Sequence, residues 1–95
     1  MSKDQIINPE KADRFKRMFG PRMQTLDNQI RLIKNCSNRD GYEWGFTDTV
    51  PYFFIVILRN LTLCAEKFGV HIEAKIDGRD VEEAFEEAEA KTNEH

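Results

Sequence analysis

Residues 52–58, with the sequence YFFIVIL, form the longest apolar run in the chain and decide how it folds. A helix that begins at residue 47 or 48, with Pro51 in its first turn, accounts for this run. Gly69 is a natural left-handed terminator, so we expect the helix to end at Phe68. Its first half is apolar on every side, which predicts a buried, central helix. In its second half we expect the polar side to face water, with Arg59, Thr62 and Glu66.

A long amphipathic helix precedes this run. Asn8 can cap its free amides, Pro9 suits the first helical position, and Glu10 favours the positive end of the dipole. Gly20-Pro21 interrupts the helical pattern, but the apolar stripe stays in phase across it, which favours one kinked helix over two helices with a reversal. We expect this helix to pack antiparallel to the buried one. Its stripe consists of Ala12, Phe15, Phe19, Met23, Leu26, Ile30 and Ile33.

The C-terminal part of the chain predicts a short strand and a last helix. Apolar and polar residues alternate over 70–76, a pattern typical of a half-buried strand. Asp77-Gly78 marks a turn, and Asp80 gives a capping-box-like start to an acidic helix. Within the chain, the strand has only the short segment 42–46 as a partner, so we expect it to pair with a twin subunit or to be a simple extended connector. The inner face of the last helix is formed by Val81, Ala84, Phe85 and Ala88.

These elements together predict a mainly α fold. A long kinked helix runs antiparallel to a buried apolar helix, followed by a short strand and a C-terminal acidic helix. The chain is 95 residues long, which predicts a single domain over 9–92 with flexible ends at 1–8 and 93–95.

The apolar run also predicts self-association. Burying one large apolar side chain contributes about 1.5–3 kcal/mol, so seven of them represent on the order of 10 kcal/mol. The other predicted helices offer only narrow stripes to cover the run. A second subunit can cover the remainder; the alternative is full burial within the monomer. The interface candidates of a homo-oligomer are Phe53, Ile55, Val56, Leu63 and Ile72.

Catalytic patterns are weak in this sequence. His71 and His95 are the two histidines, and neither has cysteines or carboxylates at metal-ligand spacing. We therefore expect no metal, no cofactor and no enzymatic activity. A thiol enzyme that uses Cys36 or Cys64 with His71 is the weakest hypothesis, because Cys64 lies on the main apolar stripe, where a core residue is expected.

Two segments have the composition of binding surfaces. Residues 11–34 hold seven Lys or Arg against two Asp, so this basic helix can bind nucleic acid through Arg14, Arg17, Arg22 and Arg31; a solvated helix face is the alternative. Aromatic residues at Tyr42, Trp44 and Phe46 form a candidate partner-binding loop, because such rings dominate binding hot spots. The alternative is that they close one end of the helical bundle.

The same loop carries a resemblance. NCSNR at residues 35–39, followed by YEW at 42–44, resembles a motif of small uncharacterised bacterial, phage and plasmid proteins, in which it joins two long helices. The resemblance covers about residues 25–68. It implies a helix–loop–helix hairpin and an origin in a mobile genetic element.

These observations predict a small, oligomeric, non-enzymatic adaptor or accessory protein that acts by protein–protein interaction. Its partners are a second copy of itself and another protein. A nucleic-acid-binding regulator is the alternative. The chain has two cysteines in no disulfide pattern, no apolar leader, and no run near the roughly 20 residues that span a membrane, so we expect a cytoplasmic protein without a membrane segment.

Overall fold

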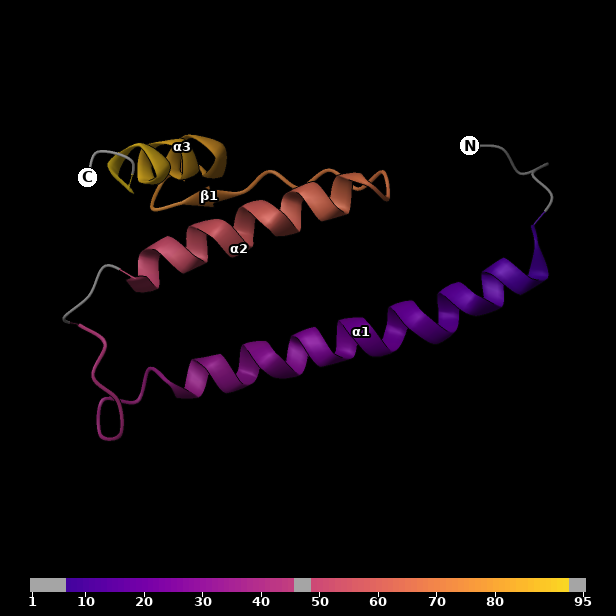
Figure 1. Cartoon of the computed structure of the whole chain (residues 1–95), viewed down its shortest axis with the longest axis horizontal. Coiled ribbons are helices and arrows are strands. Elements are labelled where there is room, and N and C mark those ends of the chain that lie inside the picture. The colour runs from indigo at the N-terminus through magenta and orange to yellow at the C-terminus, as the bar shows by residue number, and fades with distance from the viewer. Residues whose placement is uncertain (1–6, 46–48, 93–95) are drawn as a thin grey trace. The chain divides into compact units, whose positions relative to one another are not determined.

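The computed structural model describes residues 7–45 and 49–92 and shows a mainly helical chain, as the sequence predicts. The chain divides into two compact units, Met1–Glu43 and Trp44–His95. Along the chain, the elements are α1 (Pro9–Asn35), α2 (Thr49–Glu66), β1 (Lys75–Ile76), β2 (Arg79–Asp80) and α3 (Val81–Thr92) (Figure 1).

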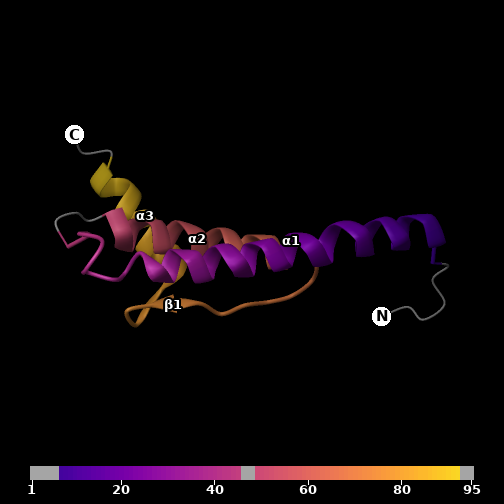
Figure 2. The ribbon, with the colours of Figure 1, turned by 90° about the horizontal axis from the view of Figure 1, so that it is seen from below.

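Helix α1 is one continuous helix. It begins as predicted: the Asn8 side chain accepts a hydrogen bond from the Lys11 amide at 3.1 Å, and Pro9 follows at the first position. Pro21 lies inside the helix. The ribbon of α1 is uninterrupted along its length in both views (Figures 1 and 2). The prediction of one helix is therefore confirmed, and two helices with a reversal are excluded.

The loop after α1 is organised around Asn38. Its backbone carbonyl accepts hydrogen bonds from the amides of Gly41 at 3.2 Å and Tyr42 at 3.0 Å. Its side chain accepts a third hydrogen bond from the Asp40 amide at 3.0 Å, which is an Asx turn. The second asparagine of the NCSN motif thus holds the loop in its turn conformation.

Helices α2 and α3 pack in opposite directions to form the second unit. The Tyr52 hydroxyl donates a hydrogen bond to Glu89 Oε2 at 2.8 Å, and Arg59 Nε donates to Glu82 Oε1 at 3.0 Å. Because a later residue of α2 meets an earlier residue of α3, the two helices are antiparallel. The predicted inner face of α3 is confirmed, since Val81 and Ala84 are buried, and Phe85 and Ala88 are half-buried.

Helix α2 is covered on one face and not buried all round, contrary to the prediction of a buried central helix. Thr62, expected to face water, is its buried residue, and its hydroxyl donates to the Arg59 carbonyl at 2.7 Å. Arg59, also expected in water, is half-buried against α3, whereas Glu66 is exposed as predicted. The physical reason is that α3 supplies Glu82 as an ionic partner, so the covered face of α2 is the one that carries its polar residues.

The strand pairs within the chain instead of with a second subunit. Asp77 and Gly78 both have positive φ, 53° and 82°, as a two-residue type I′ hairpin turn requires. This turn lets β1 pair antiparallel with β2, with Lys75 opposite Asp80. Over 70–76 the predicted alternation holds from Ile72 onward, but regular pairing is confined to β1. Gly69, at φ 75°, lies in the turn after α2 as predicted, but the helix ends at Glu66 and not at the predicted Phe68.

The contact between Tyr52 and Glu89 predicts an unusual titration. The hydrogen bond to Glu89, with smaller contributions from desolvation and the carboxylate charge, raises the pKa of Tyr52 above its ordinary value of 10. Since the folded pKa is raised, this contact stabilises the fold below pH 10, and the contribution is lost as pH rises through the folded pKa. In a Tyr42→Phe background, phenolate absorbance should give a midpoint above 10, and Glu89→Ala should lower it. Equal midpoints in the two proteins would contradict the contact.

The prediction of one domain over 9–92 stays a prediction. The predicted flexible ends fall largely on residues 1–6 and 93–95, which lie outside the described part of the chain. The same holds for Phe46 and for the predicted start of the central helix at 47–48.

Candidate functional site

The apolar stripe of α1 is uncovered by its own unit. Phe19, Met23, Leu26, Ile30 and Ile33 follow one another at spacings of four and three, the spacing of helices that pair lengthwise. These side chains are 37% to 54% exposed, and no described residue of α1 is buried. Helix α1 therefore presents a long row of apolar side chains to a partner surface.

The N-terminal end of this stripe carries an aromatic pair. The rings of Phe15 and Phe19 are stacked, with centroids 4.8 Å apart and planes 17° from parallel. Both side chains remain exposed. Large rigid rings contribute strongly to binding free energy when a partner buries them. This pair therefore adds to the binding free energy available from the stripe.

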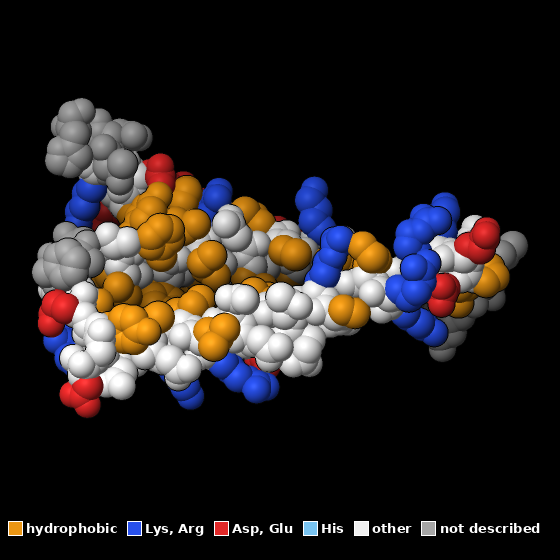
Figure 3. All heavy atoms as spheres, turned by 60° about the horizontal axis from the view of Figure 1, so that its bottom comes forward, with side chains coloured by type: hydrophobic (Ala, Val, Ile, Leu, Met, Phe, Trp, Pro, Cys, Tyr) orange, Lys and Arg blue, Asp and Glu red, His pale blue; other side chains and the backbone are white. Residues whose placement is uncertain are grey.

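The basic residues of α1 do not form a row. At 100° per residue, Arg14, Arg17, Arg22 and Arg31 spread over about half of the helix circumference. Arg17 forms an ion pair with Asp13 at 2.9 Å, and Arg31 forms one with Asp27 at 3.0 Å. Figure 3 shows a cluster of Lys and Arg side chains at the N-terminal end of α1 and further ones spread along the molecule. Nucleic-acid binding by these four arginines stays a prediction, and two of the four are already paired with carboxylates.

A second apolar surface lies on the face of α2 that α3 leaves uncovered. Its residues lie within an arc of about 100°, and each is exposed. Figure 3 shows hydrophobic side chains gathered along this helix as well as along α1. We call this surface the α2 face; it consists of Phe53, Phe54, Ile57, Leu61 and Cys64, with Phe68 in the turn that follows.

The five predicted interface residues fall into three groups. Phe53 lies on the α2 face and is 56% exposed. Ile55 and Val56 are half-buried on other sides of α2. Leu63 and Ile72 line a pocket at the C-terminal end of the helix. The structure therefore does not bring these five residues together into one surface, and their part in an oligomer interface stays a prediction.

The predicted aromatic loop is split between the two units. Tyr42 belongs to the first unit and is exposed, whereas Trp44 belongs to the second and is half-buried. Phe46 lies outside the described residues. Partner binding by this loop stays a prediction.

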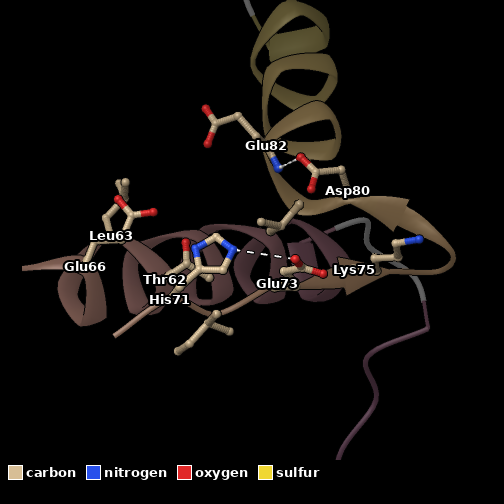
Figure 4. A pocket seen from close by; sticks show the side chains of 11 residues that line it. Thr62, Leu63, Glu66, His71, Glu73, Lys75, Asp80 and Glu82 are labelled. Atoms are coloured by element: carbon tan, nitrogen blue, oxygen red, sulfur yellow. Dashed lines mark hydrogen bonds and ion pairs between the residues drawn. The ribbon is translucent and has the colours of Figure 1, made fainter. Parts of the chain in front are cut away.

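Sequence reasoning missed the pocket in the second unit. Its volume is about 370 Å³, and its walls come from the end of α2, the segment before β1, and the start of α3 (Figure 4). His71 Nε2 lies 3.7 Å from Glu73 Oε2, and both side chains are strongly exposed. The alternation over 70–76 marked which residues face outward, but the pocket depends on the hairpin that brings Asp80 and Glu82 back toward them.

The pocket and the cysteines do not assemble into a recognisable reactive centre. Among the described residues, no group of three His, Cys, Asp or Glu side chains is arranged to hold a metal ion. Cys36 and Cys64 are both free and exposed. Cys64 lies on the apolar stripe as expected, but it is not a core residue of its unit, because α3 packs on the other face of α2.

One helix meets the length and composition of a membrane span. Helix α2 has 18 residues of mean hydropathy 1.3 with two charged side chains, and almost none of it is buried. Arg59 lies near its middle, where an arginine in the bilayer centre costs about 2.5–3.5 kcal/mol. This cost favours the prediction of a chain without a membrane segment, which stays a prediction together with the cytoplasmic location.

Comparison with known proteins adds no family to this description: no family model, no curated protein and no solved structure matches the chain. The loop resemblance stays a hypothesis.

Proposed function

We propose that this chain is a small, non-enzymatic adaptor that self-associates and acts through protein–protein contact. The observation that supports the proposal is that each unit leaves a long apolar surface uncovered, the stripe of α1 and the α2 face. Contiguous apolar surfaces that remain exposed on a folded unit mark interaction sites.

The energy available from these surfaces is large for a chain of this size. Complete burial of one large apolar side chain contributes about 1.5–3 kcal/mol, and five half-exposed ones contribute on the order of 5 kcal/mol. That is comparable to the whole stability of a small domain, about 5–15 kcal/mol. Covering the surfaces therefore provides a strong driving force for association.

The number of surfaces supports an adaptor over a simple oligomer. A protein that joins two others needs one surface for each contact, and the two units each carry one. One surface can bind a second copy while the other binds a different protein. An origin in a mobile genetic element, implied by the loop motif, belongs to the same proposal.

Light scattering tests the self-association directly. We expect a solution mass of at least twice the chain mass of 11.1 kDa, rising with protein concentration from the micromolar to the millimolar range. A compact monomer throughout that range would overturn the proposal, because the apolar surfaces would then be covered within one chain.

Matched variants test whether the α1 stripe makes a protein contact. Ile30→Glu places a charge in the stripe, and Gln24→Glu places the same charge outside the stripe, about 120° around the same helix. We expect cross-linking in the native host, read by mass spectrometry, to lose a protein neighbour with Ile30→Glu and to keep it with Gln24→Glu. Identical neighbours for both variants would contradict a role for this stripe.

A further inference from the structure

We infer that the apolar stripe of α1 binds an acidic amphipathic helix of another protein, with carboxylates of that helix along both edges of the contact. The inference rests on the partner-binding part of the proposed function and states the chemistry of that partner. The contact is made by side chains that are 41% to 54% exposed, Met23, Leu26, Ile30 and Ile33. At 100° per residue they lie within an arc of about 80°, so one partner helix can cover them along its length.

Unpaired cations lie along both edges of this stripe. Around the helix axis, Arg22 lies about 20° beyond Ile33 at one edge. Lys16 and Lys34 lie about 20° beyond Met23 at the other edge. All three cations are exposed, and none of them forms an ion pair within the described part of the chain. A helix that covers the stripe therefore meets a positive charge on each side.

The aspartates of α1 do not cancel these edge charges. Asp13 is paired with Arg17 at 2.9 Å, and Asp27 is paired with Arg31 at 3.0 Å. In both pairs the arginine lies further around the helix from the stripe than the aspartate does. Residues 11–34 contain seven Lys or Arg against two Asp, a net charge of +5. Because complementary charges favour the right partner and like charges exclude wrong ones, these edges select for carboxylates.

Among the described residues, no helix of a second copy has the required chemistry. Helix α1 of a second copy has the same positive edges and would be repelled. Helix α2 contains one carboxylate, Glu66, at its last residue. Helix α3 is acidic, but its apolar residues Val81 and Ala84 are already buried in its own unit. The occupant of the stripe is therefore a helix of a different protein.

The sequence pattern of the partner helix follows from this geometry. Its apolar residues recur at spacings of three and four, the a and d positions of a heptad, over the span from Met23 to Ile33. Asp or Glu occupies the e and g positions beside them, since those positions form ion pairs between paired helices. A helix of about three heptads is long enough to reach from Lys16 to Lys34.

Two synthetic peptides test the inference on the full chain. Both have about three heptads with Leu and Ile at a and d; one carries Glu at e and g, and the other carries Lys there. We expect the chain to bind the Glu peptide at micromolar concentration and the Lys peptide at least about tenfold more weakly, measured by fluorescence anisotropy of the labelled peptides. Raising the salt from about 0.05 M to about 0.5 M should reduce this preference, because salt screens exposed charges.

Charge reversal on α1 provides a matched variant that gains binding. Lys16→Glu, Arg22→Glu and Lys34→Glu together should invert the preference, so that the Lys peptide binds at least about tenfold more tightly than the Glu peptide. An unfolded variant could not show this gain. Ile30→Glu should weaken binding of the Glu peptide at least about tenfold, whereas Gln24→Glu, outside the stripe, should change it less than about twofold. Circular dichroism reports whether each variant remains helical.

The contrary results differ in meaning. Equal binding of the two peptides would show that the edge charges select nothing and would overturn the inference. Binding of neither peptide would also overturn it, while an oligomer in light scattering would leave the proposed self-association standing. Binding to phosphatidylserine vesicles that Ile30→Glu abolishes, with neither peptide bound, would assign the stripe to an anionic lipid surface instead. A chain that binds the Glu peptide but stays monomeric would overturn the self-association and leave this inference standing.

Discussion

Replacing Ala84 by aspartate is expected to unfold the second unit. Ala84 is 4% exposed at the centre of the contact between α2 and α3. An aspartate there would place an unpaired carboxylate in the core of the unit, at a cost of about 3–5 kcal/mol. Because a small unit has little stability to lose, we expect a large fall in helical circular dichroism at room temperature and the loss of any cooperative thermal transition.

The matched control lies on the same helix. Ala90→Asp introduces the same side chain at an exposed position near the end of α3, where the helix dipole makes it cost a few tenths of a kcal/mol. Similar unfolding by both variants would mean that the helix responds to the added charge in general, and that Ala84 does not occupy a buried position.

Replacing Arg59 by alanine is expected to destabilise the second unit by about 1–2 kcal/mol. Arg59 Nε donates to both oxygens of Glu82, at 3.0 and 3.1 Å, and its guanidinium carbon lies 4.1 Å from the centre of the Phe85 ring. The cost of losing the ion pair is modest because the Glu82 side chain remains 46% exposed, so solvent screens part of the ionic attraction. Urea unfolding followed by circular dichroism measures the change.

Two further substitutions separate the contributions at this site. Arg59→Lys keeps the charge but loses the planar fork, so its stability should lie between those of the natural chain and Arg59→Ala. Arg79→Ala removes the more exposed pair with Glu87, in which Arg79 lowers the pKa of Glu87, and it should cost less. Equal costs for Arg59→Ala and Arg79→Ala would show that the contact with Phe85 contributes nothing.

The local features of the fold could be predicted from the sequence. The start of α1, its continuity through Pro21 and the inner face of α3 depend on neighbours along the chain, so capping residues and helical spacing were sufficient. The Asp77-Gly78 turn was also evident from two adjacent residues. Asp80 was read correctly as the start of the last helix, since α3 begins at Val81 and the Asp80 carboxylate accepts a hydrogen bond from the Glu82 amide at 3.2 Å. What the sequence did not reveal is that Asp80 also pairs with β1.

The covered face of α2 could not be predicted in the same way. Arg59 and Thr62 were assigned to water because polar residues usually face solvent. In the structure, Glu82 and Phe85 give Arg59 an ionic and an aromatic partner, so the polar side of α2 packs against α3. Helical periodicity identifies the two sides of a helix, but the partner on another element decides which side becomes covered. The α2 face can be identified only once the position of α3 on the other side of the helix is known.

Pro21 divides α1 into two stretches that open with different free energies. Proline has no amide hydrogen, so the carbonyl of Arg17 lacks its partner four residues ahead, and the hydrogen-bond ladder is interrupted there. Because the ladder is interrupted at Pro21, opening of the helix that starts at Pro9 can stop there and leave the turns with Leu26 and Ile30 intact. The part of the helix that bears most of its apolar row is shielded from the opening of the basic end, and amide exchange will report the two stretches as separate kinetic populations.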